Sequence, residues 1–271
     1  MKQSLRVTLV GLTCCVCVLR AQSNFGGTDD FSSVVVGNWT ADVVEGTGSP
    51  GLTVSGDALQ LTGGPLAIGE SGRVYRDWAL NAGAVNADWT VYADFNLNFT
   101  PGSLTHTVEW ALFAFNPADT HNEYAYVSMT WNFTQLMSGF PLLESKGAIA
   151  GSESAIGSAR TASASTATLG ISYDASNQWL ITGYDLNGSL TGGLNFEPFG
   201  VFDISAWGLT SGDTFGARIF AESRAGSSAL SGGFGSGASV DDFTALSTAA
   251  ITAAAVPEPA NFAGWLAAWA G

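Results

Sequence analysis

Residues 88–100 read DWTVYADFNLNFT, and an apolar side chain occupies every second position from Trp89 to Phe99. The positions between them hold Thr90, Tyr92, Asp94, Asn96 and Asn98. Side chains of an extended strand point alternately to its two faces, so a period of two indicates one apolar and one polar face. The stretch therefore predicts a long β-strand whose apolar face is buried in a core.

Similar patterns recur along the chain and predict a structure made mainly of strands. Residues 124–133 repeat the alternation of residues 88–100. Residues 108–115 read VEWALFAF and are apolar on both faces apart from Glu109, which is typical of a central strand covered on both sides. Further strands are expected at 168–174 and 178–185, joined by a hairpin connection at 175–177, and at 214–222.

Turn signals separate these strands. Asn187-Gly188 and the glycine-rich stretch 232–237 predict turns or loops, because Asn and Gly tolerate positive φ. The stretch 147–167 is rich in Ala, Ser and Gly, has no clear period, and predicts a long loop or a weak edge strand. Roughly ten to fourteen strands are expected in all, which favours an all-β, antiparallel β-sandwich of the jelly-roll type.

The composition is consistent with a single domain of this kind over residues 24–247. The chain contains 16 Phe and 9 Trp, and only 12% of its residues are charged. A disordered chain is more charged and poorer in aromatic residues. A domain of about 220 residues buries roughly 70% of its unfolded surface, so it needs no disulfide to remain folded.

The charge balance argues against two classes of partner. The chain has 23 acidic and 9 basic residues and a net charge of −14. Three of the basic residues lie in the first twenty positions, so the remainder has 6 minus 23, or −17. A body of that charge repels nucleic-acid phosphates and anionic lipid surfaces, and we expect neither as a partner. The acidity is expected to serve solubility outside the cell.

Residues 1–22 have the pattern of a secretory signal peptide. Lys2 and Arg6 precede an apolar run from Val7 to Leu19, which is too short to span a membrane, and Ala21 is a small residue near the expected cleavage point. All 3 cysteines lie inside this run. The mature chain is therefore expected to contain no disulfide, no thiolate metal site and no cysteine nucleophile.

Some short patterns suggest chemistry, but each has a simpler explanation. Residues 46–51 match G-x-G-x-x-G, but a strand rather than a helix is expected to follow, so an ordinary turn is favoured over a dinucleotide loop. His106 and His121, the two histidines of the chain, offer too few ligands for a metal site, and no G-x-S-x-G motif accompanies them. We expect both in exposed loops and predict no catalytic or cofactor-binding residue.

Segments at both ends and in the middle of the chain resemble concanavalin A-like (laminin-G-like) jelly rolls. The resemblance rests on DDFS at 29–32, on VDDFTA at 240–245, and on the hairpin formed by LGISYD at 169–174 and WLITGYDLNG at 179–188. In that fold the first and last strands are neighbours in one sheet. The resemblance therefore implies that Phe31 and Phe243 lie close together.

Such a pairing of the terminal strands would also bring Asp29 and Asp30 close to Asp241 and Asp242. Four carboxylates in one place would need compensation, which Ca²⁺ could supply. The favoured alternative is that these side chains simply point to solvent as turn and edge residues.

The same family includes laminarinase-like glucanases, which carry Glu-x-Asp-x-x-Glu on one strand. In this chain no glutamate is followed by Asp two residues later, so catalysis is not expected. Glu109 is unusual because it lies within an aromatic strand. We expect it at an edge or rim, or in an ion pair with Arg73, Arg76 or Arg218.

The C-terminal residues 256–271 resemble the sorting tail of PEP-CTERM proteins through Val256, Pro257, Glu258 and Pro259. The resemblance implies export by a Gram-negative bacterium, processing by an exosortase-like enzyme, and only transient contact with the inner membrane. The family tail ends in a membrane-length apolar helix and a basic cluster. Here only twelve residues follow Pro259 and none is basic, so the sorting tail is expected to be truncated, after an Ala/Thr-rich linker at 248–255.

These observations predict an exported, non-catalytic protein of the periplasm, the cell surface or the extracellular matrix, associated with exopolysaccharide or biofilm. A lectin-like carbohydrate-binding module is the first alternative, and a polysaccharide hydrolase or lyase is the second. The candidates for stacking against sugar rings are Tyr124 and Tyr126, together with Trp78 or Trp207.

Overall fold

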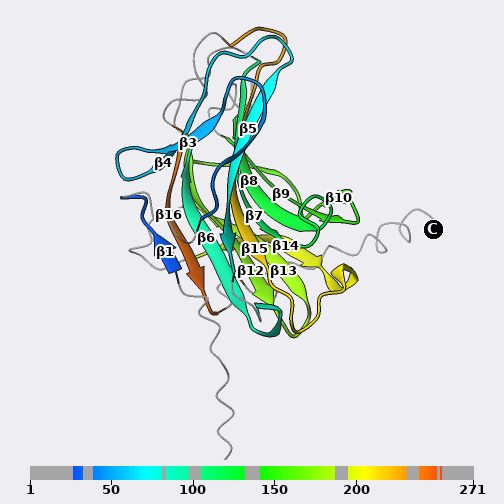
Figure 1. Cartoon of the computed structure of the whole chain (residues 1–271). Helices are drawn as coiled ribbons and strands as arrows, with labels where there is room; N and C mark the ends of the chain where they lie inside the picture. Colours follow the sequence, from blue (N-terminus) through cyan, green and yellow to red (C-terminus); the bar gives the residue numbers. More distant parts are fainter. Residues whose placement is uncertain are drawn as a thin grey trace, which may run out of the picture.

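The computed structural model describes residues 27–32, 39–80, 84–97, 105–131, 141–186, 195–230, 238–248 and 251. Two antiparallel sheets pack face to face, as Figure 1 shows, and the predicted all-β sandwich is confirmed. Strands β1–β16 are more numerous than expected, because several are short edge strands.

Sheet A has the order β14-β13-β12-β6-β16-β4-β3, with β1 paired to β16. The strands are β14 (Glu197–Asp203), β13 (Trp179–Asp185), β12 (Thr166–Asp174), β6 (Trp89–Asn96), β16 (Ser239–Leu246), β4 (Leu59–Thr62), β3 (Gly51–Val54) and β1 (Gly27–Asp29). Short 3-10 turns cover Ala84–Asn86 and Ser205–Trp207.

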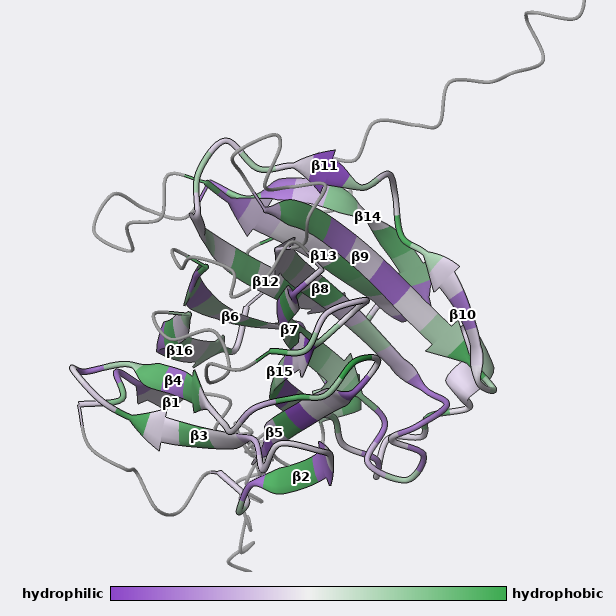
Figure 2. Ribbon diagram, turned by 90° about the horizontal axis from the view of Figure 1, so that it is seen from above, coloured by the Kyte–Doolittle hydropathy of each residue, from purple (hydrophilic) through white to green (hydrophobic). Residues whose placement is uncertain are grey.

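Sheet B has the order β10-β9-β8-β7-β15-β5-β2, with β11 paired to β9. The strands are β10 (Ser152–Ala155), β9 (Leu142–Ile149), β8 (Tyr124–Trp131), β7 (Thr107–Phe115), β15 (Gly216–Arg224), β5 (Ser71–Ala79), β2 (Val43–Gly46) and β11 (Arg160–Thr161). Figure 2 shows that β9 is apolar at its two ends and hydrophilic in the middle, where Glu144 and Lys146 lie. The stretch 147–167 thus contains the end of β9 and the short edge strands β10 and β11.

The strand predicted from residues 88–100 is β6, and its apolar residues point into the core as expected. Thr90 and Tyr92 on its polar face are also buried, which the sequence analysis did not predict, whereas Asp94 and Asn96 are partly exposed. The chain after β16 crosses this face of sheet A. Thr90 Oγ1 donates to the carbonyl oxygen of Thr248 at 2.8 Å, and the backbone N–H of Ile251 donates to Ser172 Oγ at 2.9 Å. Ile251 is therefore buried against sheet A.

The central position predicted for residues 108–115 is confirmed, since β7 lies between β8 and β15. The expectation that both faces are fully covered is wrong. Val108, Trp110 and Leu112 face the core, but Glu109 and Phe113 are only partly buried on the outer face. This outer face of sheet B forms the floor of a groove.

The predicted hairpin at 168–185 is also confirmed as β12 and β13. Asp174 shapes its turn by accepting hydrogen bonds from the backbone N–H groups of Ser176 and Asn177. The strand predicted at 214–222 is β15, whose core face carries Ala217, Ile219 and Ala221.

The first and last strands are neighbours, as the resemblance implied. In the pairing of β1 with β16, Asp29 lies opposite Phe243. The Trp39 ring joins Phe31 and Phe243, with ring centroids 6.0 Å and 4.8 Å away, and Trp78 packs against Phe243 at 4.9 Å. This aromatic cluster closes one side of the core.

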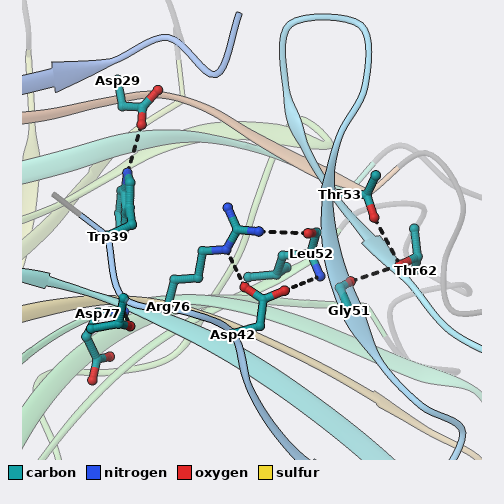
Figure 3. A network of polar contacts seen from close by, with 10 residues as sticks. Asp29, Trp39, Asp42, Gly51, Leu52, Thr53, Thr62, Arg76 and Asp77 are labelled. Carbon is teal, nitrogen blue, oxygen red and sulfur yellow. Dashed lines mark hydrogen bonds and ion pairs between the residues drawn. The ribbon is translucent and has the colours of Figure 1, made fainter. Parts of the chain in front are cut away.

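A polar clip links the two sheets beside this cluster (Figure 3). The Arg76 guanidinium, on β5 of sheet B, donates to the Asp42 carboxylate and to the carbonyl oxygen of Leu52 on β3 of sheet A, the latter at 2.9 Å. Asp42 in turn accepts the backbone N–H of Leu52 at 3.1 Å. The clip thereby satisfies backbone groups where the two sheets approach each other.

Several predicted features lie outside the described residues: the signal peptide at 1–22, the sorting tail at 256–271, and the turn signals at 187–188 and 232–237. Within the described residues, no helix has the length and apolar character needed to cross a membrane.

Candidate functional site

A groove of about 370 Å³ lies on the outer face of sheet B. Most of the lining residues come from neighbouring strands. Along each strand they alternate with residues that face the core. Five of the lining residues are aromatic: Tyr75, Phe113, Tyr124, Tyr126 and Phe220. The other nine lining residues are charged or polar, so the groove combines apolar rings with many polar groups.

The aromatic side chains form a continuous set across three strands. Phe113 on β7 lies directly opposite Tyr126 on β8, and the two rings stack with centroids 4.7 Å apart and an interplanar angle of 24°. Phe220 on β15 and Tyr124 on β8 lie 5.6 Å and 5.7 Å from Phe113. Phe113, Tyr124 and Phe220 remain partly exposed toward the groove.

Arg218 lies beside these aromatic residues, on the side of the groove formed by β5. Its guanidinium lies 3.8 Å from the centre of the Tyr75 ring and 4.7 Å from that of Phe115. It also donates two hydrogen bonds to the Asp77 carboxylate, at 2.6 Å and 3.1 Å. The planar guanidinium suits both contacts at once, so Arg218 fixes the position of this wall.

Two glutamates meet at the floor of the groove. Glu109 on β7 and Glu222 on β15 are direct partners in the antiparallel pairing. Cβ atoms of such partners are roughly 4.5–5.5 Å apart. Glu222 accepts a hydrogen bond from the Arg224 guanidinium at 3.0 Å, whereas Glu109 has no ion-pair partner among the described residues.

The surroundings of Glu109 favour its neutral form. Burial raises the pKa of Glu109 to about 7, and the carboxylates of Glu222 and Glu144 add to the rise, while Lys146 opposes it. The Ser128 hydroxyl also opposes the rise, but it is buried and makes no hydrogen bond of normal geometry within the described residues. Near neutral pH this carboxyl therefore changes between a hydrogen-bond donor and an anion.

Glu109 was expected at an edge or rim, or in an ion pair with one of three arginines, and the structure contradicts both the edge position and the ion pair. It lies on a central strand rather than at an edge. The three arginines proposed for it bind other carboxylates: Arg73 contacts Glu45 at 3.7 Å, Arg76 contacts Asp42, and Arg218 contacts Asp77. Sequence alone does not reveal which strands pair, and pairing decides these contacts.

The aromatic candidates divide into two groups. Tyr124 and Tyr126 line the groove, as expected of residues on the polar face of their strand. Trp78 and Trp207 are not available for a ligand, because each is only 6% exposed and belongs to the core. The indole N–H of Trp207 donates to the carbonyl oxygen of Ala148.

The two histidines also differ from each other. His121 is exposed, as predicted, and lies at the rim of the groove. His106 is buried, contrary to the prediction, with its Nε2 atom 2.8 Å from Ser223 Oγ, and burial lowers the pKa of its ring. The G-x-G-x-x-G stretch is a turn between β2 and β3, with positive φ at Gly46 and Gly48.

The four aspartates considered for Ca²⁺ lie on or beside the paired strands β1 and β16. The Asp29 carboxylate, however, is engaged by the Trp39 indole N–H and the Phe31 backbone N–H. Asp30 accepts the backbone N–H of Ser32, and Asp241 that of Asp242. Within the described ranges, no group of three or more His, Cys, Asp or Glu residues converges on a point that could hold a metal ion.

Sequence analysis missed Tyr75, Phe113, Phe220 and Glu222 as lining residues. A signal was present for two of them, because Phe220 and Glu222 alternate with the core residues Ala217, Ile219 and Ala221. Large aromatic and charged residues in the phase opposite to the core are expected on an outer face. The same alternation rule, applied to β7 and β5, places Phe113 and Tyr75 on the outer face of sheet B.

No protein-family model matches the chain, and no curated protein matches it in sequence. Solved structures do match. The CBM2 module of the evolved Dit protein of Lactobacillus casei BL23 phage J-1 has a TM-score of 0.53 at 8% identity, over 83% of this chain and 96% of that chain. Lectin I-B4 of Griffonia simplicifolia, in its metal-free form, has a TM-score of 0.43 at 13% identity, over 81% and 98%.

A third match is GH43B of the Bacteroides ovatus xyloglucan locus, with a TM-score of 0.45 at 15% identity. It covers 80% of this chain but 38% of that chain. At such low identities the similarity shows the fold alone. The phage module supports the fold observed here: the chain is an antiparallel two-sheet sandwich.

Proposed function

We propose that this chain is an exported, non-catalytic carbohydrate-binding protein whose ligand lies in the groove of sheet B. The observation that carries the proposal is the set of five aromatic side chains on one outer face, beside carboxyl and guanidinium groups. Sugar rings have apolar faces that pack on aromatic rings and hydroxyl edges that hydrogen-bond to polar side chains, so the groove offers both kinds of contact.

The names of the structural neighbours support this proposal. They include a CBM2 module and lectins, together with one protein labelled GH43B. The architecture alone does not assign a function, so the proposal depends on the side chains of the groove.

The test is binding of the purified full-length protein to a glycan array that includes neutral, acidic and amino sugars, followed by titration with the best oligosaccharide. We expect retention of at least one glycan class and weaker binding by Phe113→Ala. Ile68→Ala is the matched control, because Ile68 is 66% exposed and lies outside the groove. Retention of no glycan of any class would refute the proposal.

A second candidate function is hydrolysis of a polysaccharide, which the Glu109–Glu222 pair favours. Retaining glycosidases use two carboxyl groups about 5–5.5 Å apart, one protonated and one ionised. Release of reducing sugar from β-glucans or xylans, lost in both Glu109→Gln and Glu222→Gln, would support this function. Binding without release of sugar would support the non-catalytic one.

We also propose that Val256, Pro257, Glu258 and Pro259 direct sorting by an exosortase-like enzyme and place the protein at the surface or in the exopolysaccharide matrix of a Gram-negative bacterium. The support is the motif itself, combined with a signal-peptide pattern. Replacing Pro257, Glu258 and Pro259 with alanine should abolish processing and retain the protein in the cell fraction. Unchanged processing and location would refute the role of the motif.

A further inference from the structure

The basic side chains around the groove are already paired with carboxylates of this chain. Arg73 contacts Glu45 at 3.7 Å, Arg224 contacts Glu222 at 3.0 Å, and Lys146 contacts Glu153 at 3.4 Å. Arg218 is bound by two hydrogen bonds to Asp77. Positive charge is therefore neutralised locally, and the groove offers little attraction for an anionic ligand.

Negative charge is in excess at the floor. Glu109 lies opposite Glu222 on one side, and the Glu144 carboxylate is close enough to raise the Glu109 pKa further. Neither Glu109 nor Glu144 has an ion-pair partner among the described residues. Burying carboxyl groups without a counter-charge is costly unless they remain protonated, so a cation bound beside Glu109 would stabilise its ionised form.

Some of the aromatic rings that line the groove with Glu109 carry no cation in the described part of the chain. The guanidinium of Arg218 covers Tyr75 and Phe115, whereas no cation lies over Phe113, Tyr126 or Phe220 in the described part of the chain. The faces of aromatic rings attract ammonium groups, most strongly where water is excluded. The stacked pair of Phe113 and Tyr126 lines the same groove as Glu109, whose charge is close enough to help raise the pKa of the Tyr126 phenol, mainly raised by burial.

The buried hydroxyl of Ser128 also favours the ionised form of Glu109, although the two make no hydrogen bond of normal geometry. Ser128 is fully buried on the groove side of β8, and its Oγ atom has no hydrogen-bond partner among the described residues. An ionised Glu109 would give this hydroxyl a charged acceptor, and such hydrogen bonds are stronger than neutral ones. A bound cation that ionises Glu109 would therefore satisfy two groups at once.

We infer, on the basis of the proposed carbohydrate-binding function, that the groove selects a sugar carrying a free amine, whose ammonium group lies beside Glu109 in the groove that Phe113 and Tyr126 also line. The remainder of the sugar packs on the partly exposed rings of Tyr124 and Phe220. The net charge of −14 for the chain adds a general attraction for a polycationic glycan.

The experiment is titration calorimetry of the full-length protein at pH 6 with three oligosaccharides of equal length: β-1,4-linked glucosamine, its N-acetylated form, and cello-oligosaccharide. We expect the amine form to bind about tenfold to hundredfold more tightly than the other two, which corresponds to one charge-assisted hydrogen bond. Glu109→Gln should remove this preference.

Two controls separate a specific site from general attraction. Glu197→Gln removes the same charge from an exposed position on β14, outside the groove, and should leave the preference intact. Wild-type binding at pH 6 should release protons as Glu109 ionises, so the measured enthalpy should depend on the buffer, and this dependence should disappear in Glu109→Gln.

Equal binding of the amine and cello-oligosaccharides, or equal losses in Glu109→Gln and Glu197→Gln, would overturn the amine inference while leaving carbohydrate binding in place. Binding of none of the three sugars, together with an empty glycan array, would instead overturn the proposed function itself.

Discussion

Glu109 and Glu222 face each other across the β7–β15 pair at the floor of the groove, and only Glu222 has a basic partner there. Like charges directly opposite on neighbouring strands destabilise a sheet. Burial is the main cause that raises the pKa of Glu109 to about 7 from the ordinary value of 4.5, and repulsion by Glu222 adds to it, so protonation of Glu109 relieves both costs. The pair should therefore make the stability of the domain depend on pH.

The first prediction follows from the sign of this shift. Between pH 4.5 and 7 the native state retains the Glu109 proton that the unfolded state has lost, so the free energy of unfolding should fall as pH rises. Relative to Glu109→Gln, which cannot ionise, the wild type should lose up to about 3 kcal/mol over this interval. Urea unfolding of both proteins from pH 4.5 to pH 8 measures the difference.

The difference between the two proteins is the informative quantity, because other carboxyl groups act in the opposite direction. Hydrogen bonds lower the pKa values of Asp30 and Asp203, and such groups add stability as pH rises from acid. Parallel profiles for the wild type and Glu109→Gln would contradict a raised pKa at Glu109.

The second prediction concerns Phe113, which contacts the other aromatic residues of the central wall. Phe113→Ala removes the ring that stacks on Tyr126 and should weaken oligosaccharide binding at least tenfold, since lost stacking and lost apolar contact each contribute about 1 kcal/mol. Phe113 is partly exposed, so stability should fall less than for a core residue. Titration calorimetry and urea unfolding measure the two effects, and unchanged affinity would place the ligand elsewhere.

Arg218 provides the third prediction. Arg218→Lys keeps the charge but loses one of the two hydrogen bonds to Asp77 and the flat contact with Tyr75. We expect the free energy of unfolding to fall by about 1–2 kcal/mol. Arg224→Lys is the matched control, because its side chain is 58% exposed and its ion pair should contribute less than about 1 kcal/mol. Equal effects of the two changes would show that the stacking of Arg218 adds nothing.

The sequence predicted the sandwich because alternation is a local property. Each strand requires only its own residues to show a period of two, and Trp89 to Phe95 or Ala217 to Ala221 do so clearly. The pairing of the end strands came from a resemblance between short motifs and was confirmed by the contacts of Trp39. These features do not depend on knowing which distant strands become neighbours.

The site was harder to predict because it forms only where strands that are distant in sequence pair with each other. Glu109 and Glu222 are far apart in sequence, and only the β7–β15 register brings them together. His106 was expected at the surface, but it is buried because Ser223 supplies a hydrogen-bond partner from a distant strand. Trp78 was a sugar-binding candidate, yet the aromatic cluster around Phe243 places it in the core. In each case the deciding contact is non-local.

The fourth prediction tests the closure of the sandwich by its terminal strands. Phe243 on β16 is completely buried between Trp39 and Trp78, which connect it to β1 and β5. Phe243→Ala should lower the free energy of unfolding by about 3–5 kcal/mol, because the large cavity cannot collapse between two rigid indoles. Phe243→Leu keeps most of the volume and should cost clearly less. Urea unfolding measures both changes, and a loss below about 1 kcal/mol for Phe243→Ala would mean that the cluster does not hold the end strands together.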